Sequence, residues 1–354
     1  MNSSSIIIYR LFDIADEIDL DHVQALWAAR NKIASRLRLE RVSPKAIAFK
    51  DPPVSVELGS HEIMLGGRPH LAEIRARIYD IGVISIIVRI DLPEQATYDD
   101  FLDLAIASEN IPEDKIHELV KSVADTIKQA LIKPREPEFE EDLVVYYLYE
   151  WKKDWDIVQL LLKDRIPASK QTREETLANC LSYAEDVAYF TWDAALVYDP
   201  SGSMDIPDLL EFANAQFLEL RYYDNLLEKE IGTMYTELEK ITSISDRQRL
   251  RNYRRIRGQL MELVADVASL TDRINNSLRV TEDVFYARVY SLYIRLLRAD
   301  SWRQSIDSNI SVIQRTYNML NEEVITRRSE FLDTAVVALL GLIALLNIYA
   351  IFLR

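Results

Sequence analysis

The residues of this chain whose chemistry could be catalytic or metal-binding are few. His22, His61, His70 and His117 lie in separate segments with no HExxH or similar spacing, so a metal site would have to assemble from distant residues. Cys180 is the single cysteine, which excludes an internal disulfide framework and a multi-thiolate zinc site. With 8 glycines and neither GxxxxGK[ST] nor GxGxxG, nucleotide hydrolysis is disfavoured. We predict no enzyme activity, no cofactor and no metal site.

An arginine-rich stretch, DRQRLRNYRRIRG, stands out in a chain of net charge −15. Its six arginines are Arg247, Arg249, Arg251, Arg254, Arg255 and Arg257. Near an anionic membrane each would contribute about 1 kcal/mol to binding, so we expect contact with lipid headgroups or another anion. A solvated helix surface is the alternative. The acidic balance elsewhere disfavours nucleic acid as a general partner.

The first 150 residues predict alternating strands and helices. Apolar, β-branched runs at 6–14, 54–58, 71–91 and 143–149 indicate strands, and helical patterns follow Asp19 and recur at 98–107 and 113–132. Gly66-Gly67 suits a hairpin turn, and Gly82 suits a bulge within a central strand. The order β-α-β-β-α-β is typical of a ferredoxin-like α/β sandwich, so the predicted fold class is α+β. Residues 151–206 are predicted to be a helical connector.

Residues 207–333 change to a heptad pattern. Apolar residues spaced alternately three and four apart predict helices at 208–243, 250–298 and 302–333, with a break at 275–283 as the alternative for the second. The seam predicted to join copies of the chain includes Leu220, Asp224, Leu227 and Ile231. Asp224 either fixes the register of the seam or binds a cation. In an antiparallel bundle the arginine-rich stretch would lie at the membrane end.

The segment 334–353, TAVVALLGLIALLNIYAIFL, predicts a transmembrane helix. It carries no charge, and a helix of this length rises about 30 Å, the thickness of a bilayer core. Arg327 and Arg328 precede it, MNSSSIIIYR does not look like a signal peptide, and only Arg354 follows. We therefore expect a single-pass protein of the cytoplasmic (inner) membrane, with its N-terminal bulk in the cytoplasm.

The stretch from Leu278 to Leu346 resembles the end of the required-for-meiotic-nuclear-division family, as a bacterial-like member. Asn321-Glu322-Glu323 and Arg328-Ser329-Glu330-Phe331-Leu332-Asp333 stand where that family has an NEK-like turn and an R-x-E/L-x-L-D/E segment before one membrane span. YDIGVISI at 79–86 is similar to the family's aromatic-Asp-aromatic-Gly-Val-Val strand. The resemblance implies a membrane-anchored, oligomerising protein, and it supplies no catalytic residues to carry over. Mitochondrial members of the family support translation of membrane proteins.

These patterns together predict a non-enzymatic, tail-anchored membrane scaffold or tether. Its ferredoxin-like domain (1–150) and connector (151–206) would precede a coiled-coil bundle (207–333) and the membrane helix (334–353). The expected partners are a second copy of the chain, membrane lipid and another protein. The alternative is a CorA-like cation channel or ion-sensing subunit, because those proteins also place long helices after an α/β domain. Their Gly-Met-Asn signature is absent from this chain.

Overall fold

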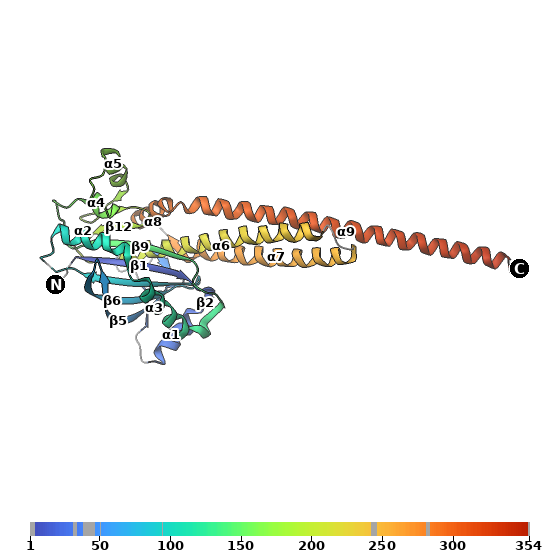
Figure 1. The fold of residues 1–354 in the computed structure, drawn as a ribbon, viewed down its shortest axis with the longest axis horizontal. Coiled ribbons are helices and arrows are strands. Elements are labelled where there is room, and N and C mark those ends of the chain that lie inside the picture. The colour runs from blue at the N-terminus through green and yellow to red at the C-terminus, as the bar shows by residue number, and fades with distance from the viewer. Residues whose placement is uncertain are drawn as a thin grey trace. The chain divides into compact units, whose positions relative to one another are not determined.

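A large, mainly antiparallel sheet organises the N-terminal part of the protein in a computed structural model (Figure 1), which describes residues 4–30, 34–37, 47–49, 51–93, 95–241, 246–280 and 284–352. The sheet has nine strands in the order β10-β11-β12-β9-β1-β7-β6-β5-β3. In chain order these strands are β1 (Ser5–Asp13), β3 (Ala34–Arg36), β5 (Val54–Leu65), β6 (Arg68–Ile78), β7 (Val83–Asp91), β9 (Glu140–Leu148), β10 (Cys180–Leu181), β11 (Val187–Phe190) and β12 (Ala194–Tyr198).

Neighbouring strands of this sheet are antiparallel except β12, which pairs in parallel with β9. Two small ladders stand beside it. One pairs β2 (Ala15–Ile18) with β8 (Leu131–Pro134), and the other pairs β4 (Ile47–Phe49) with β13 (Leu278–Val280).

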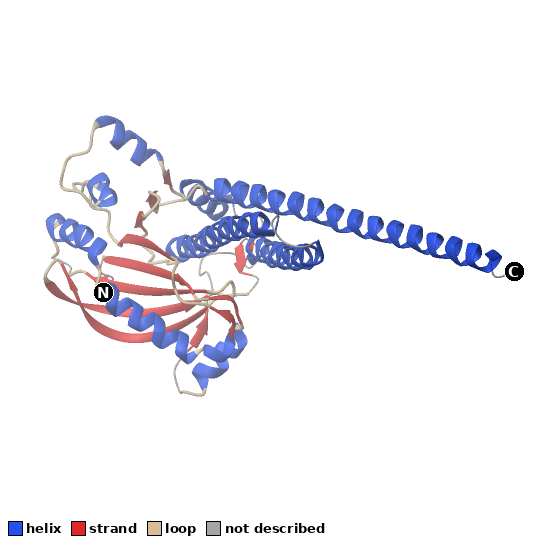
Figure 2. Ribbon diagram, turned by 45° about the vertical axis from the view of Figure 1, so that its right-hand side comes forward, coloured by secondary structure: helices blue, strands red, loops and turns tan. Residues whose placement is uncertain are grey.

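One face of the sheet is covered by three helices, α1 (Leu20–Ala28), α2 (Tyr98–Ala107) and α3 (Glu113–Thr126) (Figure 2). Side chains alternate between the two faces of a strand, and in β1 Ile6, Ile8 and Phe12 join the core beneath these helices. Asp19 caps α1, and Thr97 forms a capping box with Asp100 at the start of α2. Single-turn 3₁₀ helices follow α2 (Ser108–Asn110) and α3 (Lys128–Ala130).

The opposite face of the sheet is covered by the first part of α6 (Asp205–Ile241). The ring of Phe212 on α6 lies 6.0 Å from that of Tyr79, and the Tyr147 hydroxyl of β9 donates to the Ser203 carbonyl at 2.9 Å. Helix α8 (Val284–Leu296) packs on α6 in turn, where Asn214 donates to the Tyr293 hydroxyl at 2.8 Å. Helix α6 therefore brings its own polar side chains against the sheet.

The remaining helices are α4 (Ile157–Leu162), α5 (Lys170–Ala178), α7 (Asp246–Ser277) and α9 (Ala299–Phe352). The chain divides into two compact units, one of residues 1–222 with 270–303 and one of residues 223–269 with 304–354. This division differs from the four predicted segments. The predicted connector at 151–206 supplies β10, β11 and β12 to the sheet. The helix predicted at 250–298 ends at Ser277, within the alternative break at 275–283.

The predicted ferredoxin-like sandwich, which has four strands, is wrong. The described residues form a sheet of nine strands. The continuous strand expected at 71–91 is instead a hairpin, in which a turn at 79–82 separates β6 from β7. Gly82 belongs to that turn with a φ of 102° and is not a bulge. The predicted hairpin at Gly66-Gly67 is confirmed, with φ angles of 56° and 75° between β5 and β6.

No helix in the described part of the chain combines the length and the apolar character needed to cross a membrane. The predicted transmembrane helix at 334–353 is therefore wrong. The single-pass topology and the inner-membrane location inferred from it are wrong as well.

Candidate functional site

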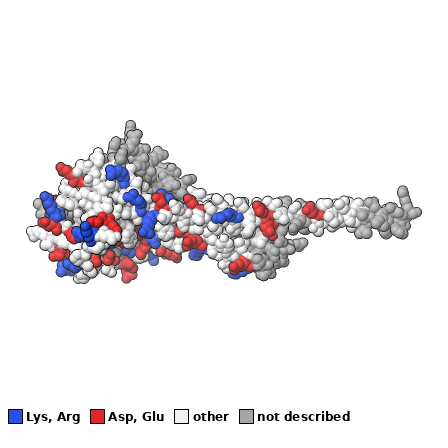
Figure 3. Space-filling view, turned by 90° about the horizontal axis from the view of Figure 1, so that it is seen from above, with Lys and Arg blue, Asp and Glu red and all other residues white. Residues whose placement is uncertain are grey.

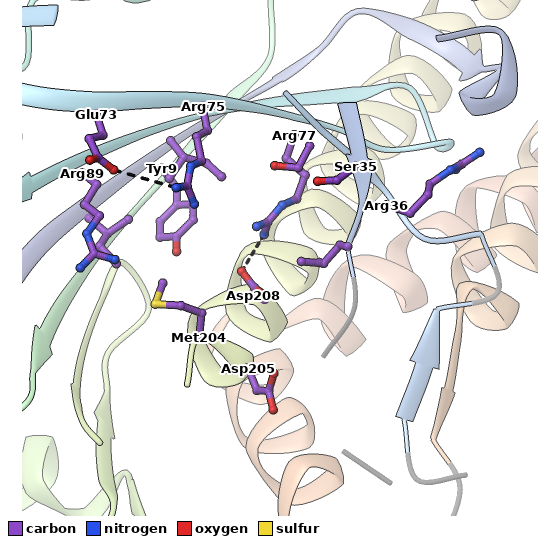
Figure 4. Close-up of a pocket in the computed structure, with 14 residues that line it drawn as sticks. Tyr9, Ser35, Arg36, Glu73, Arg75, Arg77, Arg89, Met204, Asp205 and Asp208 are labelled. Carbon is purple, nitrogen blue, oxygen red and sulfur yellow. Dashed lines mark hydrogen bonds and ion pairs between the residues drawn. The ribbon is translucent and has the colours of Figure 1, made fainter. Parts of the chain in front are cut away.

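A pocket of about 370 Å³ lies on the α6-covered face of the sheet (Figure 4). Its lining comes from β1, β3, β5, β6, β7 and the first turns of α6. The polar members are Tyr9, Ser35, Arg36, Ser55, Glu73, Arg75, Arg77, Arg89, Asp205 and Asp208, and the apolar ones are Ile7, Leu37, Ile87 and Met204. All of these residues belong to one compact unit.

Two neighbouring strands supply the basic side of the pocket. On β6, Glu73, Arg75 and Arg77 are spaced two apart and so share one face of the sheet, and Arg89 of β7 pairs with Glu73 in the ladder. Arg75 is half-exposed, and its ion pairs with the exposed Glu57 and Glu73 measure 3.8 and 3.9 Å, which is too long for hydrogen bonds. Arg75 therefore keeps its donors available to a ligand.

Arg36 also lines the pocket but is committed elsewhere. Its guanidinium points away from Tyr9 in Figure 4 and donates to Gln24 Oε1 at 3.0 Å, to the Pro52 carbonyl at 2.7 Å and to Asp21. Arg89 is anchored through its Nε, which donates to Asp91 at 2.8 Å. The arginines that lie around Tyr9 are therefore Arg75, Arg77 and Arg89.

A buried ion cluster forms the floor of the pocket. Arg77 Nη1 donates to Asp208 Oδ1 at 2.8 Å and also to Glu211 Oε2, and both carboxylates come from α6. Burial raises the pKa of Glu211 to about 7, although the charge of Arg77 opposes the shift. Burial and the charge of Glu211 raise the pKa of Tyr9 well above its usual value. The Tyr9 hydroxyl therefore stays protonated and acts as a donor.

A second buried cluster ties α6 to the sheet further along the helix. Arg135 Nε lies 3.1 Å from Asp13 Oδ1, and its guanidinium stacks 3.8 Å from the centre of the Tyr222 ring. Glu219 of α6 is fully buried and interacts with Asp13. Burial raises the pKa of both carboxyls, and that of Glu219 is raised further by the charge of Asp13. This pair therefore holds a proton at neutral pH.

Replacing Glu219 by glutamine is expected to flatten the dependence of stability on pH. Because the folded-state pKa of each carboxyl is raised, the folded protein binds more protons than the unfolded one, and stability is lost as pH rises toward and through 7. The loss is at most about 1.4 kcal/mol per pH unit for each group. Urea unfolding of both proteins between pH 5 and 8 measures this, and equal slopes would contradict it.

The predicted arginine cluster lies on α7, in the second of the two compact units. Arg255 Nη2 donates to Glu237 of α6 at 3.1 Å, Arg257 Nη1 donates to Asn321 of α9 at 2.8 Å, and Arg251 and Arg254 are exposed. The side chains of Arg247 and Arg249 lie outside the described residues, as do residues 242–245. In the view of Figure 3, acidic and basic side chains are interspersed. Contact of the six arginines with lipid or another anion stays a prediction.

The predicted seam residues are covered by helices of the same chain. Leu220 and Leu227 are buried, Ile231 is half-buried, and Asp224 is buried and accepts a hydrogen bond from Asn309 Nδ2 at 3.2 Å. The Asp224 bond joins α6 to α9 within one compact unit. The heptad spacing is thus accounted for without a second copy, and homo-oligomerisation stays a prediction.

The four histidines lie on four different elements, α1, β5, β6 and α3. Among the described residues, no three His, Cys, Asp or Glu side chains gather in an arrangement that could hold a metal ion. Cys180 lies on strand β10, and burial raises the pKa of its thiol. The structure brings none of these residues into the pocket.

The family model that describes the N-terminal domain of uncharacterized protein MJ0711 matches residues 3–205, more than half of the 354 residues. The chain belongs to this family. The match covers every strand that lines the pocket and ends where α6 begins. The protein MJ0711 of Methanocaldococcus jannaschii is 21% identical over 245 residues, which cover 64% of this chain and 71% of that protein. No solved structure matches the chain significantly.

This membership corrects the resemblance to the required-for-meiotic-nuclear-division family, which is wrong. That resemblance used short motifs from the C-terminal third and one strand, whereas the matched family covers the sheet domain. The sequence patterns did not predict the pocket. Its signals were the alternation Glu73, Arg75, Arg77 along one strand and the spacing Asp205, Asp208, Glu211 along one helix face.

Proposed function

We propose that the sheet domain is a non-enzymatic binding module for a small anionic ligand held in the pocket beside Tyr9. The observation that carries the proposal is the convergence of Arg75, Arg77 and Arg89 on one cavity (Figure 4). The volume of about 370 Å³ falls within the range of small-molecule sites. The ligand would carry a carboxylate, sulfate or phosphate group, because guanidinium donors match the oxygens of such groups.

The three arginines differ in how far their N–H donors are already engaged by carboxylates. Arg77 is neutralised by Asp208 and Glu211, so it shapes the floor of the pocket. Arg75 makes only long, exposed ion pairs, which contribute little to stability and are readily exchanged for a ligand. Arg89 and the Tyr9 hydroxyl add donors from two further strands of the same sheet. We therefore assign the main contact with the anion to Arg75.

A binding role fits the lining better than catalysis does. Asp208 is engaged by Arg77, and Asp205 accepts a hydrogen bond from the Tyr286 hydroxyl at 3.3 Å. Tyr9, with its raised pKa, is a donor rather than a base. The charged groups of the pocket are thus suited to holding an anion in place.

Replacing Arg75 by glutamine is expected to weaken anion binding about tenfold or more, because a charged hydrogen bond contributes about 1.5–3 kcal/mol. Titration calorimetry with sulfate, and then with small carboxylates, measures the affinity. Arg68→Gln is the matched control, since it removes the same charge from an exposed position on the same strand outside this pocket. Equal affinities of the wild type and Arg75→Gln, or no binding by the wild type, would reject the proposal.

A scaffold that joins two copies of the chain is the second candidate. The observation in its favour is that the helices of the second unit expose large apolar side chains outside the seam, namely Tyr235, Met261, Met319 and Ile325. A second copy would cover them. Sedimentation at several concentrations tests this candidate, and a mass of 41.0 kDa throughout would contradict it.

A further inference from the structure

In the described part of the chain, the floor of the pocket brings two carboxyl groups to one guanidinium group. Arg77 is shared by Asp208 and Glu211, and the exposed fraction of the three side chains is 8%, 8% and 0%. With both carboxylates ionised, these three groups sum to a charge of −1 directly beneath a pocket that we assign to an anion. When one carboxyl carries a proton, the three groups sum to zero. One proton thus changes the charge of the cluster beneath the anion.

Glu211 is the member of the cluster placed to carry that proton. Its side chain has no solvent exposure, whereas Asp208 borders the pocket. The groups that face Glu211 are Tyr9 from β1, Arg77 and Tyr79 at the end of β6, Ser85 from β7 and Asp208 from α6 itself. Burial raises the pKa of both tyrosines, so neither adds a charge, and Arg77 is the one cation among these five.

We propose that Glu211 takes up a proton when the pocket takes up an anion, so that the two ligands bind together. An anion placed beside Arg77 adds negative charge next to two buried carboxylates, and the least solvated carboxylate responds by binding a proton from solvent. No bond forms between Glu211 and the ligand. By thermodynamic linkage, the bound anion raises the affinity of Glu211 for a proton, and protonation of Glu211 raises the affinity of the pocket for the anion by the same factor. A lower pH therefore strengthens anion binding. This inference depends on the proposed function.

Titration calorimetry of the full chain with sulfate at pH 7, in buffers of different ionisation enthalpy, measures the protons taken up. Sulfate is the probe because its own charge does not change in this pH range, unlike that of phosphate. The pKa of about 7 means that Glu211 is about half protonated before binding, so uptake approaches about half a proton per anion. The affinity should also fall between pH 6 and pH 8, by at most tenfold per pH unit.

Glu211→Gln is expected to abolish both the proton uptake and the pH dependence while still binding sulfate. Its amide oxygen can accept the hydrogen bond of Arg77, so the contact is kept and only the titration is lost. The matched control is Glu73→Gln, which removes one unit of charge from an exposed position on the rim. This control should bind sulfate more tightly and keep the proton uptake.

The buffer experiment on the wild type needs no variant, so it stands even if Glu211→Gln does not fold. Sulfate binding without proton uptake would overturn this inference and leave the proposed function standing. Proton uptake that persists in a folded Glu211→Gln protein would also overturn it, because another group would then hold the proton. Absence of sulfate binding would reject the proposed function and this inference together.

Discussion

Replacing Arg77 by methionine is expected to lower the free energy of unfolding by about 3–5 kcal/mol, the range for breaking a buried ion pair. The substitution keeps an apolar stem of similar length but removes the guanidinium that the buried Asp208 and Glu211 share. Urea unfolding at pH 7.5 measures the loss. The defect should shrink as the pH is lowered toward 5.5, because protonation of the two carboxyls relieves the uncompensated charge.

Arg75→Met is the matched control for this prediction. Arg75 lies on the same strand and the same face two residues earlier, but it is half-exposed and its ion pairs are long, so its loss should cost less than about 1 kcal/mol. Adding Asp208→Asn and Glu211→Gln to Arg77→Met should restore part of the stability. Equal losses for Arg77→Met and Arg75→Met would show that the buried cluster does not hold α6 on the sheet.

The features that were predicted correctly are those with local chemistry. Gly66-Gly67 marks a tight turn because both residues adopt positive φ angles, and Asp19 caps α1 through its own side chain. By contrast, the pairing of β12 with β9 is parallel and joins segments about 50 residues apart, and nothing in β12 itself indicates its partner. Whether such a short segment forms a strand depends on its packing against the neighbouring strands of the sheet.

The heptads show why periodicity alone did not assign the partner of a helix. Spacing of three and four requires that an apolar stripe be covered, and it does not say whether the covering helix belongs to the same chain. Here Asp224 of α6 accepts a hydrogen bond from Asn309 of α9, so this position of the stripe is covered by a helix of the same chain. Composition likewise led to a wrong prediction at 334–353, where an uncharged run was taken to indicate a transmembrane helix.

The candidate site could not be assembled from the sequence because its members are far apart. Arg77 and Glu211 are 134 residues apart in the chain, and they meet only because α6 crosses the face of the sheet that Tyr9 and Arg77 share. The alternation along β6 places Arg75 and Arg77 on one face, but it does not reveal that acidic residues of a distant helix cover that face. A charged stripe on a strand usually faces solvent.

Gly82→Ala is expected to be the most damaging single-methyl substitution at a described glycine. A Cβ at this position would lie 1.9 Å from the Ala15 carbonyl oxygen, and the φ of 102° is itself unfavourable for alanine. The Gly82 carbonyl also accepts a hydrogen bond from Ile14 N at 3.1 Å, so the turn has little room to move. Left-handed strain costs about 1–2 kcal/mol and forced repacking about 1–3 kcal/mol, which together predict a loss of about 2–5 kcal/mol.

Gly59→Ala separates the two causes of this loss. Gly59 has a similar φ of 96° at the irregular position in β5, but a Cβ added there would meet no atom within 4 Å, so only the conformational cost applies. Thermal and urea unfolding of both variants should show a loss of about 1–2 kcal/mol for Gly59→Ala and a clearly larger loss for Gly82→Ala. If the two losses were equal, the close approach of the β6–β7 turn to Ala15 would not constrain the fold. The hairpin would then be positioned by the apolar pairing of β7 with β1 alone.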